Sequence, residues 1–347
     1  KTLKNKLQIK ETVGMENPLH YRNKAQYPIG INKKGEPVIG VFANRTHEVI
    51  PIDNCLIQNK KSEEIAKFII EFIKEKNISI YDEKKGKGLV RHIVTKVGIK
   101  TGEIMCVIVI NGHKIPNENE LVENLKTRYP EIKAIVKNIN MKNTNVILGQ
   151  ENINLYGNGY IEDILGEYKF KISPLSFYQV NPVQAEKLYN LGVSMAEITK
   201  NDVVFDLYCG IGTISLFMSK FAKKVYGIEI VEEAVKMAKE NAQNNNVSNT
   251  EFFAGDVEIV LDDLINNKGL KADVVMFDPP RKGLDKKSID NILNIRPKKI
   301  VYISCNPATL IRDLADFENE YDIKTIIPVD MFPFTSHVEC VAVMCIK

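Results

Sequence analysis

The sequence predicts two domains: an α+β domain over residues 1–170, then an α/β domain with a Rossmann-like sheet of seven strands over residues 171–347. Three observations carry this prediction. From about residue 200, apolar strands alternate strictly with helical segments, which is typical of a doubly wound parallel sheet. Before residue 170, strands and helices follow one another without that alternation. The net charge also changes, from +7 over residues 1–170 to −4 over the remainder.

The composition is that of an ordinary globular protein, with 44% hydrophobic and 26% charged residues. No apolar run is long enough to span a membrane, and the lysine-rich start lacks the apolar core of a signal peptide. Six cysteines in so long a chain do not resemble a secreted disulfide framework. We therefore expect a cytoplasmic monomer without a membrane partner. The absence of an initiator methionine indicates a fragment or a processed chain.

The first domain reads as an antiparallel sheet with two helices. Its amphipathic segments predict helices at 60–76 and 117–129 and strands at 27–31, 37–43, 48–52, 89–97, 104–110, 131–139, 145–150 and 159–172. The first 20 or so residues show a weak helical period in Leu3, Leu7, Ile9 and Val13, and they could pack on the second domain.

Basic side chains cluster at the turns of the first domain. They are Arg22, Lys24, Lys33, Lys34, Lys84, Lys85, Lys87, Arg91 and His92. Lysines in glycine-flanked loops suit phosphate contacts, which position a nucleic acid without reading its sequence. A solvated lysine-rich surface explains the charge about equally well.

In the second domain, the first strand (203–209) runs into the sequence DLYCGIG (206–212), where Gly210 lets a ligand approach the backbone. Ser215 stands where a dinucleotide-binding fingerprint has its third glycine. Glu229 closes the second strand, placed to accept both hydroxyls of a ribose, and Asp256 closes the third, where adenine is commonly recognised. A nucleoside without a pyrophosphate fits this pattern, which favours S-adenosylmethionine over NAD.

The fourth strand ends in DPPR (278–281), in which the prolines could fix the Asp278 carboxylate beside a cofactor. An ordinary proline-stiffened turn is the alternative. In enzymes that methylate exocyclic amines, the tetrapeptide at the corresponding strand end finishes with an aromatic residue that stacks on the flipped target base. Arg281 in that place argues against such chemistry.

Cys305 ends the strand at 298–305, at the sheet edge where ligands of parallel sheets bind. A buried, inert thiol is the alternative. C5 of uracil becomes nucleophilic only after a thiolate adds to C6, and a general base must then remove the C5 proton. Glu339, at the start of the last strand (338–346), is the candidate base, with His337 as runner-up. Glu339 could instead be a surface residue at a strand end.

Six motifs in order resemble the RNA (uracil-5-)-methyltransferases, bacterial enzymes that make 5-methyluridine in ribosomal and transfer RNA. They are FYQVN (177–181), DLYCGIG (206–212), GIE (227–229), DPPRKG (278–283), SCNP (304–307) and HVEC (337–340). The late strand pair at 322–329 and 338–346 also resembles the sheet ending of class I methyltransferases. MENPLHYRNK (15–24) and GKGLVRH (86–92) resemble the central domain of the same family.

The resemblance implies a role for each matched residue. Cys305 would be the nucleophile and Glu339 the proton acceptor, acting on a base flipped out of its stack. S-adenosylmethionine would contact Gln179, Tyr208, Gly210, Glu229 and Asp278, with Asp256 near its adenine. Phe177 would help to hold the flipped base or the cofactor, and the basic first domain would bind the RNA. Because FYQVN is closer to the ribosomal branch, the implied substrate is a uridine of 23S ribosomal RNA.

Many ribosomal members of that family also have an N-terminal β-barrel and a [4Fe–4S] cluster on four cysteines. Cys55 matches the fourth of these cysteines, and the other three would precede the first residue of this sequence. A stable cluster needs four thiolates, so a cluster is expected only in a longer protein. In this chain we expect Cys55 to be a buried free thiol.

Three other functions stay open at this point: a tRNA (uracil-5-)-methyltransferase, an RNA cytosine-5 methyltransferase and an inactive RNA-binding protein of the same fold. Cytosine-5 chemistry commonly uses a cysteine in the fourth-strand motif, and DPPR has none. An inactive protein would tolerate loss of Cys305 or Glu339, and both are present.

Overall fold

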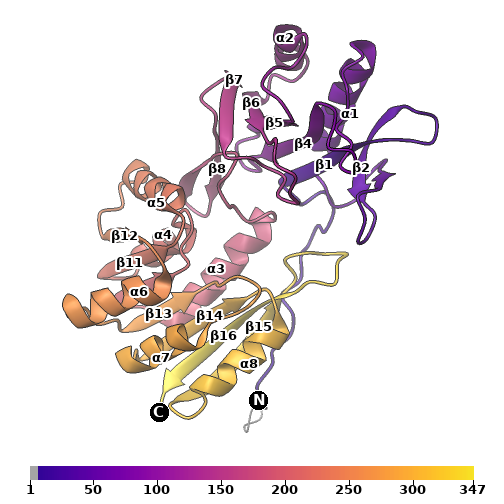
Figure 1. The fold of residues 1–347 in the computed structure, drawn as a ribbon. Helices are drawn as coiled ribbons and strands as arrows, with labels where there is room; N and C mark the ends of the chain where they lie inside the picture. Colours follow the sequence, from indigo (N-terminus) through magenta and orange to yellow (C-terminus); the bar gives the residue numbers. More distant parts are fainter. Residues whose placement is uncertain (1–6) are drawn as a thin grey trace. The chain divides into compact units, whose positions relative to one another are not determined.

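The computed structural model describes residues 7–347, which form two compact units (Figure 1). The N-terminal unit contains residues 18–164 and 171–176. The C-terminal unit contains residues 7–17, 165–170 and 177–347. No helix in the described range has the length and apolar character needed to cross a lipid bilayer.

The N-terminal unit is built on a seven-stranded sheet with the order β3-β2-β1-β4-β5-β6-β7. Neighbouring strands are antiparallel except for β5 and β6, which are parallel. The prediction of a purely antiparallel sheet was therefore wrong at this pair, because the helix between them returns the chain to the same end of the sheet. The strands are β1 (Lys24–Ile31), β2 (Pro37–Phe42), β3 (Val49–Pro51), β4 (Val90–Val97), β5 (Ile104–Ile110), β6 (Ile132–Ile139) and β7 (Glu151–Tyr156).

Two helices, α1 (Lys60–Glu75) and α2 (Glu118–Arg128), share one core cluster with this sheet. The apolar stripe of α1, including Ile65, Ile69 and Ile73, is almost completely buried there. Asn59 caps the helix by accepting a hydrogen bond from the backbone N–H of Lys61 at 2.9 Å. Both helices were predicted from their periodicity, and the structure confirms them to within a residue or two at each end.

Two strand predictions in this half were wrong. The strand expected at 145–150 lies instead at β7, Glu151–Tyr156. The strand expected at 159–172 is a hairpin of β8 (Ile161–Leu165) and β9 (Tyr168–Ile172). Gly166 has a φ of 62°, a left-handed conformation that turns the chain back where an extended strand would continue.

The C-terminal unit has a second seven-stranded sheet, with the order β12-β11-β10-β13-β14-β16-β15. Its first five strands are parallel, and β16 inserts antiparallel between β14 and β15. All seven strands were predicted from the sequence and are confirmed. They are β10 (Val203–Leu207), β11 (Lys224–Glu229), β12 (Thr250–Ala254), β13 (Val274–Phe277), β14 (Lys299–Ser304), β15 (Tyr321–Val329) and β16 (Glu339–Ile346).

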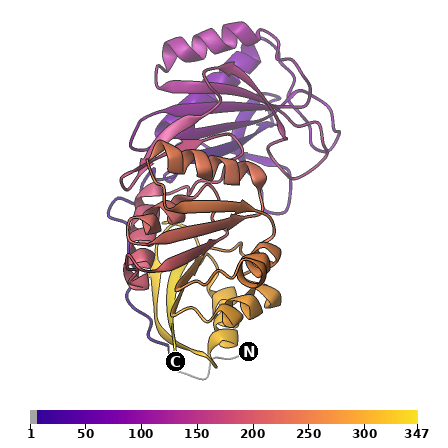
Figure 2. The same ribbon diagram turned by 90° about the vertical axis from the view of Figure 1, so that its left-hand side faces the viewer.

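Helices cover both faces of this second sheet (Figure 2). Ile300 and Tyr302 of β14 belong to one core cluster with α6, α7 and α8, whereas a side chain on Gly192 of α3 would meet the alternate residues Val301 and Ile303. Successive strand side chains point to opposite faces, so the alternation assigns these helices to two sides. The helices are α3 (Pro182–Ala196), α4 (Thr213–Ser219), α5 (Glu232–Asn244), α6 (Val257–Asp262), the π-helical turn η1 (Asp263–Asn267), α7 (Lys286–Ile295) and α8 (Pro307–Phe317).

The segment before residue 18 is extended where it is described, so the helical prediction there was wrong from Leu7 to Val13; Leu3 lies outside the described residues. Ile9 and Val13 form parallel bridges with the edge strand β15. The backbone N–H groups of Lys10 and Val13 donate to carbonyls of that strand, both at 2.9 Å. An unpaired sheet edge offers hydrogen bonds along its whole length, and this outweighs a weak helical preference.

Tyr302 connects the core of β14 to the neighbouring helix. Its hydroxyl donates a hydrogen bond of 2.8 Å to Asp313 of α8, whose side chain is 1% exposed. The same carboxylate accepts the backbone N–H of Leu284 at 2.9 Å, which ties down the loop after β13.

We therefore expect Tyr302→Phe to destabilise the protein by about 1.5–3 kcal/mol, because a buried charged acceptor loses a partner. Urea unfolding measures the change. Tyr226→Phe is the matched control, since that hydroxyl has no hydrogen bond in the described part of the chain and its removal should be close to neutral. Equal midpoints for the two variants would contradict the role given to Tyr302.

Candidate active site

A cavity of about 620 Å³ opens at the carboxyl ends of the parallel strands of the C-terminal unit. All eight residues that the sequence nominated for catalysis or cofactor binding in this unit line it, and so do Phe177 and His337. The eight are Gln179, Tyr208, Gly210, Glu229, Asp256, Asp278, Cys305 and Glu339.

Strand register explains why residues so far apart in sequence meet here. Leu207 of β10 lies beside Ile228 of β11 and Phe277 of β13. The next residue of each strand, Tyr208, Glu229 and Asp278, therefore emerges at the same level of the sheet. Tyr208 has a φ of 66°, an uncommon value for a bulky residue that turns the chain sharply at the strand end.

The nucleophile and base candidates are brought together by an antiparallel pair. Ser304 at the end of β14 lies opposite Cys340 of β16. Continuing that register by one residue sets Cys305 against Glu339. Beyond the cysteine, Asn306 caps α8 by accepting the N–H of Ala308 at 3.1 Å, and Pro307 occupies the first helical turn. The SCNP motif thus ends a strand and starts a helix, leaving the half-buried thiol at the cavity wall.

Glu339 is a buried carboxyl with unused hydrogen-bonding capacity. It is 3% exposed, and its Oε2 has no hydrogen-bond partner in the described chain. Burial, reinforced by the nearby Asp278 carboxyl, raises the pKa of Glu339 to about 8, and Arg281 opposes the shift. Burial likewise raises the pKa of the Cys305 thiol, with smaller contributions from Glu339 and Asp278. A buried, unpaired acid beside a thiol is typical of a catalytic pair.

Asp278 connects this pair to the FYQVN motif. The side-chain amide of Gln179 donates to Asp278 at 3.4 Å, and burial raises the pKa of Asp278 to about 7. Two residues after Gln179, Asn181 caps α3 by accepting the N–H of Gln184 at 3.2 Å. The motif therefore has a structural part, the helix cap, and a part that faces the cavity.

The opposite end of the cavity holds Glu229 and Asp256. The Glu229 carboxylate accepts the backbone N–H groups of Gly210 at 3.1 Å and Val231 at 3.0 Å. Asp256 caps α6 by accepting the N–H of Glu258 at 2.9 Å. These backbone contacts fix both carboxylates at the ends of neighbouring strands, a geometry suited to the hydroxyl and amino groups of a nucleoside.

In the sequence, Ser215 served only as evidence against a pyrophosphate site; in the structure, it forms a buried hydrogen bond. Its hydroxyl donates to Asp206, and both residues are completely buried. Burial raises the pKa of Asp206 to about 7, while the bond to Ser215 opposes that rise. A glycine at position 215 would remove the hydroxyl donor from a buried carboxyl whose other oxygen, Oδ1, already has no hydrogen-bond partner in the described chain.

Sequence reasoning missed several residues that line the cavity. Tyr189 lies in the middle of α3, and Phe332 comes from the turn before β16. Neither belongs to a recognisable strand-end motif, so no signal in the sequence pointed to them. Asp285, which caps α7, could have been found as a polar residue just before a helical segment.

The charge of the cavity favours a cationic ligand. Its lining has six acidic residues and two basic ones, Arg281 and Lys282. The acidic residues are Glu229, Asp256, Glu258, Asp278, Asp285 and Glu339. A positively charged group near Asp278 and Glu339 would offset the unfavourable burial of their charged forms. The sulfonium and amino groups of S-adenosylmethionine fit this requirement.

Cys55 belongs to the N-terminal unit, in the loop before α1. It is a free thiol and half-buried, rather than buried as the sequence predicted. The backbone N–H groups of Asn54 and Cys55 donate to the Glu63 carboxylate, at 2.9 and 3.0 Å. The described residues contain no cluster of three or more metal-binding side chains.

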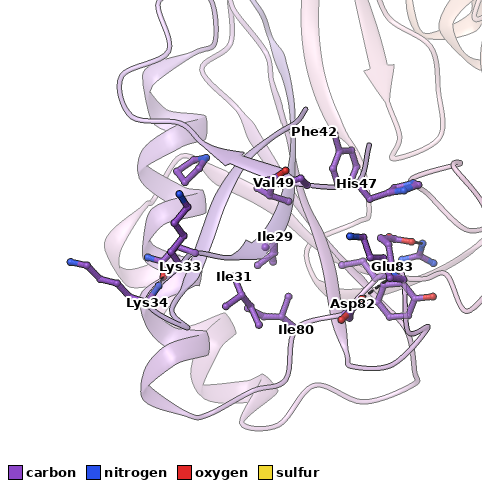
Figure 3. Close-up of a pocket in the computed structure, with 17 residues that line it drawn as sticks. Ile29, Ile31, Lys33, Lys34, Phe42, His47, Val49, Ile80, Asp82 and Glu83 are labelled. Atoms are coloured by element: carbon purple, nitrogen blue, oxygen red, sulfur yellow. Dashed lines mark hydrogen bonds and ion pairs between the residues drawn. The ribbon is translucent and has the colours of Figure 1, made fainter. Parts of the chain in front are cut away.

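A second cavity, of about 660 Å³, lies within the N-terminal unit. Figure 3 shows Ile29, Ile31 and Ile80 among the residues that line it, while Lys33 and Lys34 extend from the turn between β1 and β2. Lys84 also lines it. These three lysines are exposed, as phosphate contacts would need to be.

Two of the basic residues nominated as phosphate contacts do not fit that role. Arg91 is 3% exposed and forms a bidentate pair with Glu83 at 2.9 and 3.0 Å. Its guanidinium also lies 4.3 Å from the centre of the Tyr81 ring. His92 is buried, and burial lowers its pKa to about 4, so the ring is neutral at pH 7. Both side chains are therefore buried and inaccessible to a phosphate.

The strand order, the antiparallel β16 and the cavity at the strand ends define a class I S-adenosylmethionine-dependent methyltransferase. A solved structure supports the same class. The tRNA (uracil-54, C5)-methyltransferase of Pyrococcus abyssi, in complex with S-adenosyl-L-homocysteine, matches with a TM-score of 0.79. It is 30% identical, and the match covers 96% of this chain and 78% of that chain.

The model of the tRNA (uracil-5-)-methyltransferase family matches residues 3–347, and this chain belongs to that family. An uncharacterized RNA methyltransferase of Caldanaerobacter subterraneus subsp. tengcongensis is 50% identical over 333 residues, which cover 96% of this chain and 73% of that protein. One from Staphylococcus aureus strain COL is 46% identical over 339 residues, covering 98% and 75%. The chain is therefore an S-adenosylmethionine-dependent RNA methyltransferase.

The raised pKa of Asp278 leads to a pH prediction. The carboxyl is mostly protonated at pH 6 and mostly ionised at pH 8, and the cationic cofactor should bind the ionised form better. We expect the affinity for S-adenosylmethionine to rise by up to about tenfold between pH 6 and 8, the limit for linkage to one group of pKa about 7. Isothermal titration calorimetry measures it.

Asp278→Asn is the matched variant and should flatten this pH dependence. S-adenosylhomocysteine, which lacks the sulfonium charge, should show a smaller rise in the unaltered protein. A slope that Asp278→Asn leaves unchanged would show that another group is responsible.

Proposed function

We propose that this protein methylates C5 of a uridine in 23S ribosomal RNA, through a covalent adduct between Cys305 and C6 of the base. The observation that carries the proposal is the pairing of Cys305 with the buried, unpartnered Glu339 in one cavity. The acidic lining of that cavity supports a cationic methyl donor on its other side.

Each step has a residue suited to it. The Cys305 thiolate adds to C6, which places negative charge on the C4 carbonyl and makes C5 nucleophilic. S-adenosylmethionine would supply the methyl group: C5 bonds to the methyl carbon, the carbon–sulfur bond breaks, and S-adenosylhomocysteine is released. Glu339 then accepts the C5 proton, and the electron pair of that C–H bond restores the C5–C6 double bond as the Cys305 thiolate leaves. The product is 5-methyluridine, with one proton left on Glu339.

Glu339 is a better candidate than His337 for the base. The carboxyl is buried beside the thiol, whereas His337 is exposed and stacks edge-on against Phe332, with ring centres 6.2 Å apart. A pKa of about 8 makes Glu339 a strong base for a carboxylate. A nearby sulfonium lowers that pKa and increases the ionised fraction.

The roles proposed for Cys305 and Glu339 can be tested separately with two substrates, RNA that contains 5-fluorouridine and ordinary RNA. Cys305→Ala should form no covalent adduct with either RNA. Glu339→Gln should still transfer a methyl group and then remain attached to ordinary RNA, because the C5 proton is not removed and the thiolate cannot leave. Denaturing gels detect the adduct. His337→Gln is the control and should turn over without accumulating it; an adduct with Cys305→Ala would refute the nucleophile.

The choice of 23S RNA rests on the FYQVN motif, which is closer to the ribosomal branch of the family. A tRNA substrate is the second candidate, because the Pyrococcus abyssi enzyme of similar structure acts on tRNA. RNA from a strain lacking the gene tests the choice. Tritiated methyl groups should enter its 23S RNA and not its tRNA, and the opposite result would establish the second candidate.

The exposed lysines of the N-terminal unit are proposed to hold the RNA backbone. Lys33, Lys34 and Lys84 border the cavity of Figure 3, and Lys85 and Lys87 lie in the same loop as Lys84. Contacts of this kind give affinity that falls steeply with salt and carry no sequence information.

We expect the double variant Lys33→Ala/Lys34→Ala to weaken RNA binding and to reduce the slope of log affinity against log salt by about 1–2. Filter binding at several salt concentrations measures both. The control is Lys236→Ala/Lys239→Ala, which removes two exposed lysines from α5 of the other unit. If both double variants change the slope equally, the cavity lysines have no special role.

A further inference from the structure

Phe334 is an exposed aromatic residue in an unfavourable backbone conformation. It is 68% exposed, and its φ is 64°, in the left-handed region that bulky residues rarely adopt. Within the described residues its ring has no aromatic or cation–π partner. Strain of this kind persists only where the surroundings impose it, and it concentrates at functional positions.

The turn that carries Phe334 is held firmly from within. The N–H and hydroxyl of Thr335 both donate to the carbonyl of Phe332, at 3.1 and 2.7 Å. The N–H of His337 in turn donates to the Thr335 hydroxyl at 3.2 Å. The exposed ring is therefore presented by a rigid turn and not by a loose loop.

The base of the same turn is anchored to α3. The side-chain amide of Asn181 donates to the carbonyl of Met331 at 3.0 Å, and Gln184 donates to the carbonyl of Asp330 at 3.0 Å. Met331 is completely buried. These bonds fix the position of the turn within the C-terminal unit.

The turn also forms part of the active-site wall. Phe332 and His337, on either side of Phe334 in sequence, line the cavity that contains Cys305 and Glu339. The exposed cations Arg281 and Lys282 line the same cavity. A substrate strand that delivers a base to Cys305 must pass a rim that carries positive charge and exposed aromatic rings.

We propose that Phe334 is a stacking platform for the RNA base next to the uridine that enters the cavity. The inference rests on the proposed function, because it requires an RNA strand at this rim. Flipping one base leaves its neighbour without a stacking partner, and an aromatic ring replaces that partner. A rigid phenyl ring stacks on any base, so this subsite adds affinity without reading sequence.

The test compares Phe334→Ala with Phe334→Trp and Phe334→Leu, using total RNA from a strain lacking the gene as substrate. We expect Phe334→Ala to raise KM for RNA about 5- to 150-fold, the loss of one base–aromatic stack. Phe334→Trp should restore KM, whereas Phe334→Leu, which is apolar but not aromatic, should not. The affinity for S-adenosylmethionine should stay constant in all three. Phe221→Ala, which removes another exposed phenylalanine of the same unit, is the matched control.

Phe334→Gly separates stacking from a structural role. Glycine adopts a positive φ without strain, so the urea midpoint should hold or rise while KM for RNA increases. A lower midpoint with unchanged KM, or equal KM for Phe334→Ala and Phe221→Ala, would overturn the inference. If the unaltered protein transfers no methyl group to any RNA, the proposed function itself fails, an outcome distinct from both.

Discussion

The register between β14 and β16 is the constraint on which the site depends. The ladder pairs Ser304 with Cys340. Cys305, the residue after β14, therefore meets Glu339, the first residue of β16, at the cavity. A slip of one residue would turn the side chain of Glu339 to the other face of the sheet. From Val341 to Met344, β16 is buried on both faces, and Ala342 and Met344 pack in the core cluster of α6, α7 and α8, so a slip would also exchange the side chains that fill the two helix layers. Packing of the core thus sets the chemistry.

Burial of several carboxyls at this edge of the sheet is a second constraint, and it links the charge of a bound ligand to the ionisation of Asp278 and Glu339. Burial disfavours the charged forms of Asp278 and Glu339, and the Asp278 carboxyl adds to this effect at Glu339, so the cavity alone favours the protonated forms. A cation between the cofactor end and the thiol reverses this preference. Under the proposed mechanism, the ionised form of Glu339 is therefore favoured while the cationic methyl donor is bound.

Strand ends could be predicted well because their signal is local. An apolar run that stops at a polar residue identifies the edge of a buried sheet, and Glu229, Asp278 and Cys305 were all found in this way. Interactions between distant segments could not be predicted. The extended form of Ile9 to Val13 depends on β15, and the burial of Arg91 and His92 depends on the sheet around them. The contacts of Ser215 and Tyr189 likewise become visible only when the helices are packed.

The pairing of residues 8–13 with β15 has a consequence for how the catalytic unit can be handled. Without this segment, β15 would be an unpaired edge strand. Backbone groups such as the carbonyl and the N–H of Ile326 would then be free to pair with another chain. A catalytic unit excised from residue 165 onward would keep every cavity residue and lose this cover. We expect such a fragment to be prone to strand-to-strand self-association, because the backbone that covers β15 belongs to the same unit but lies about 150 residues earlier in the sequence.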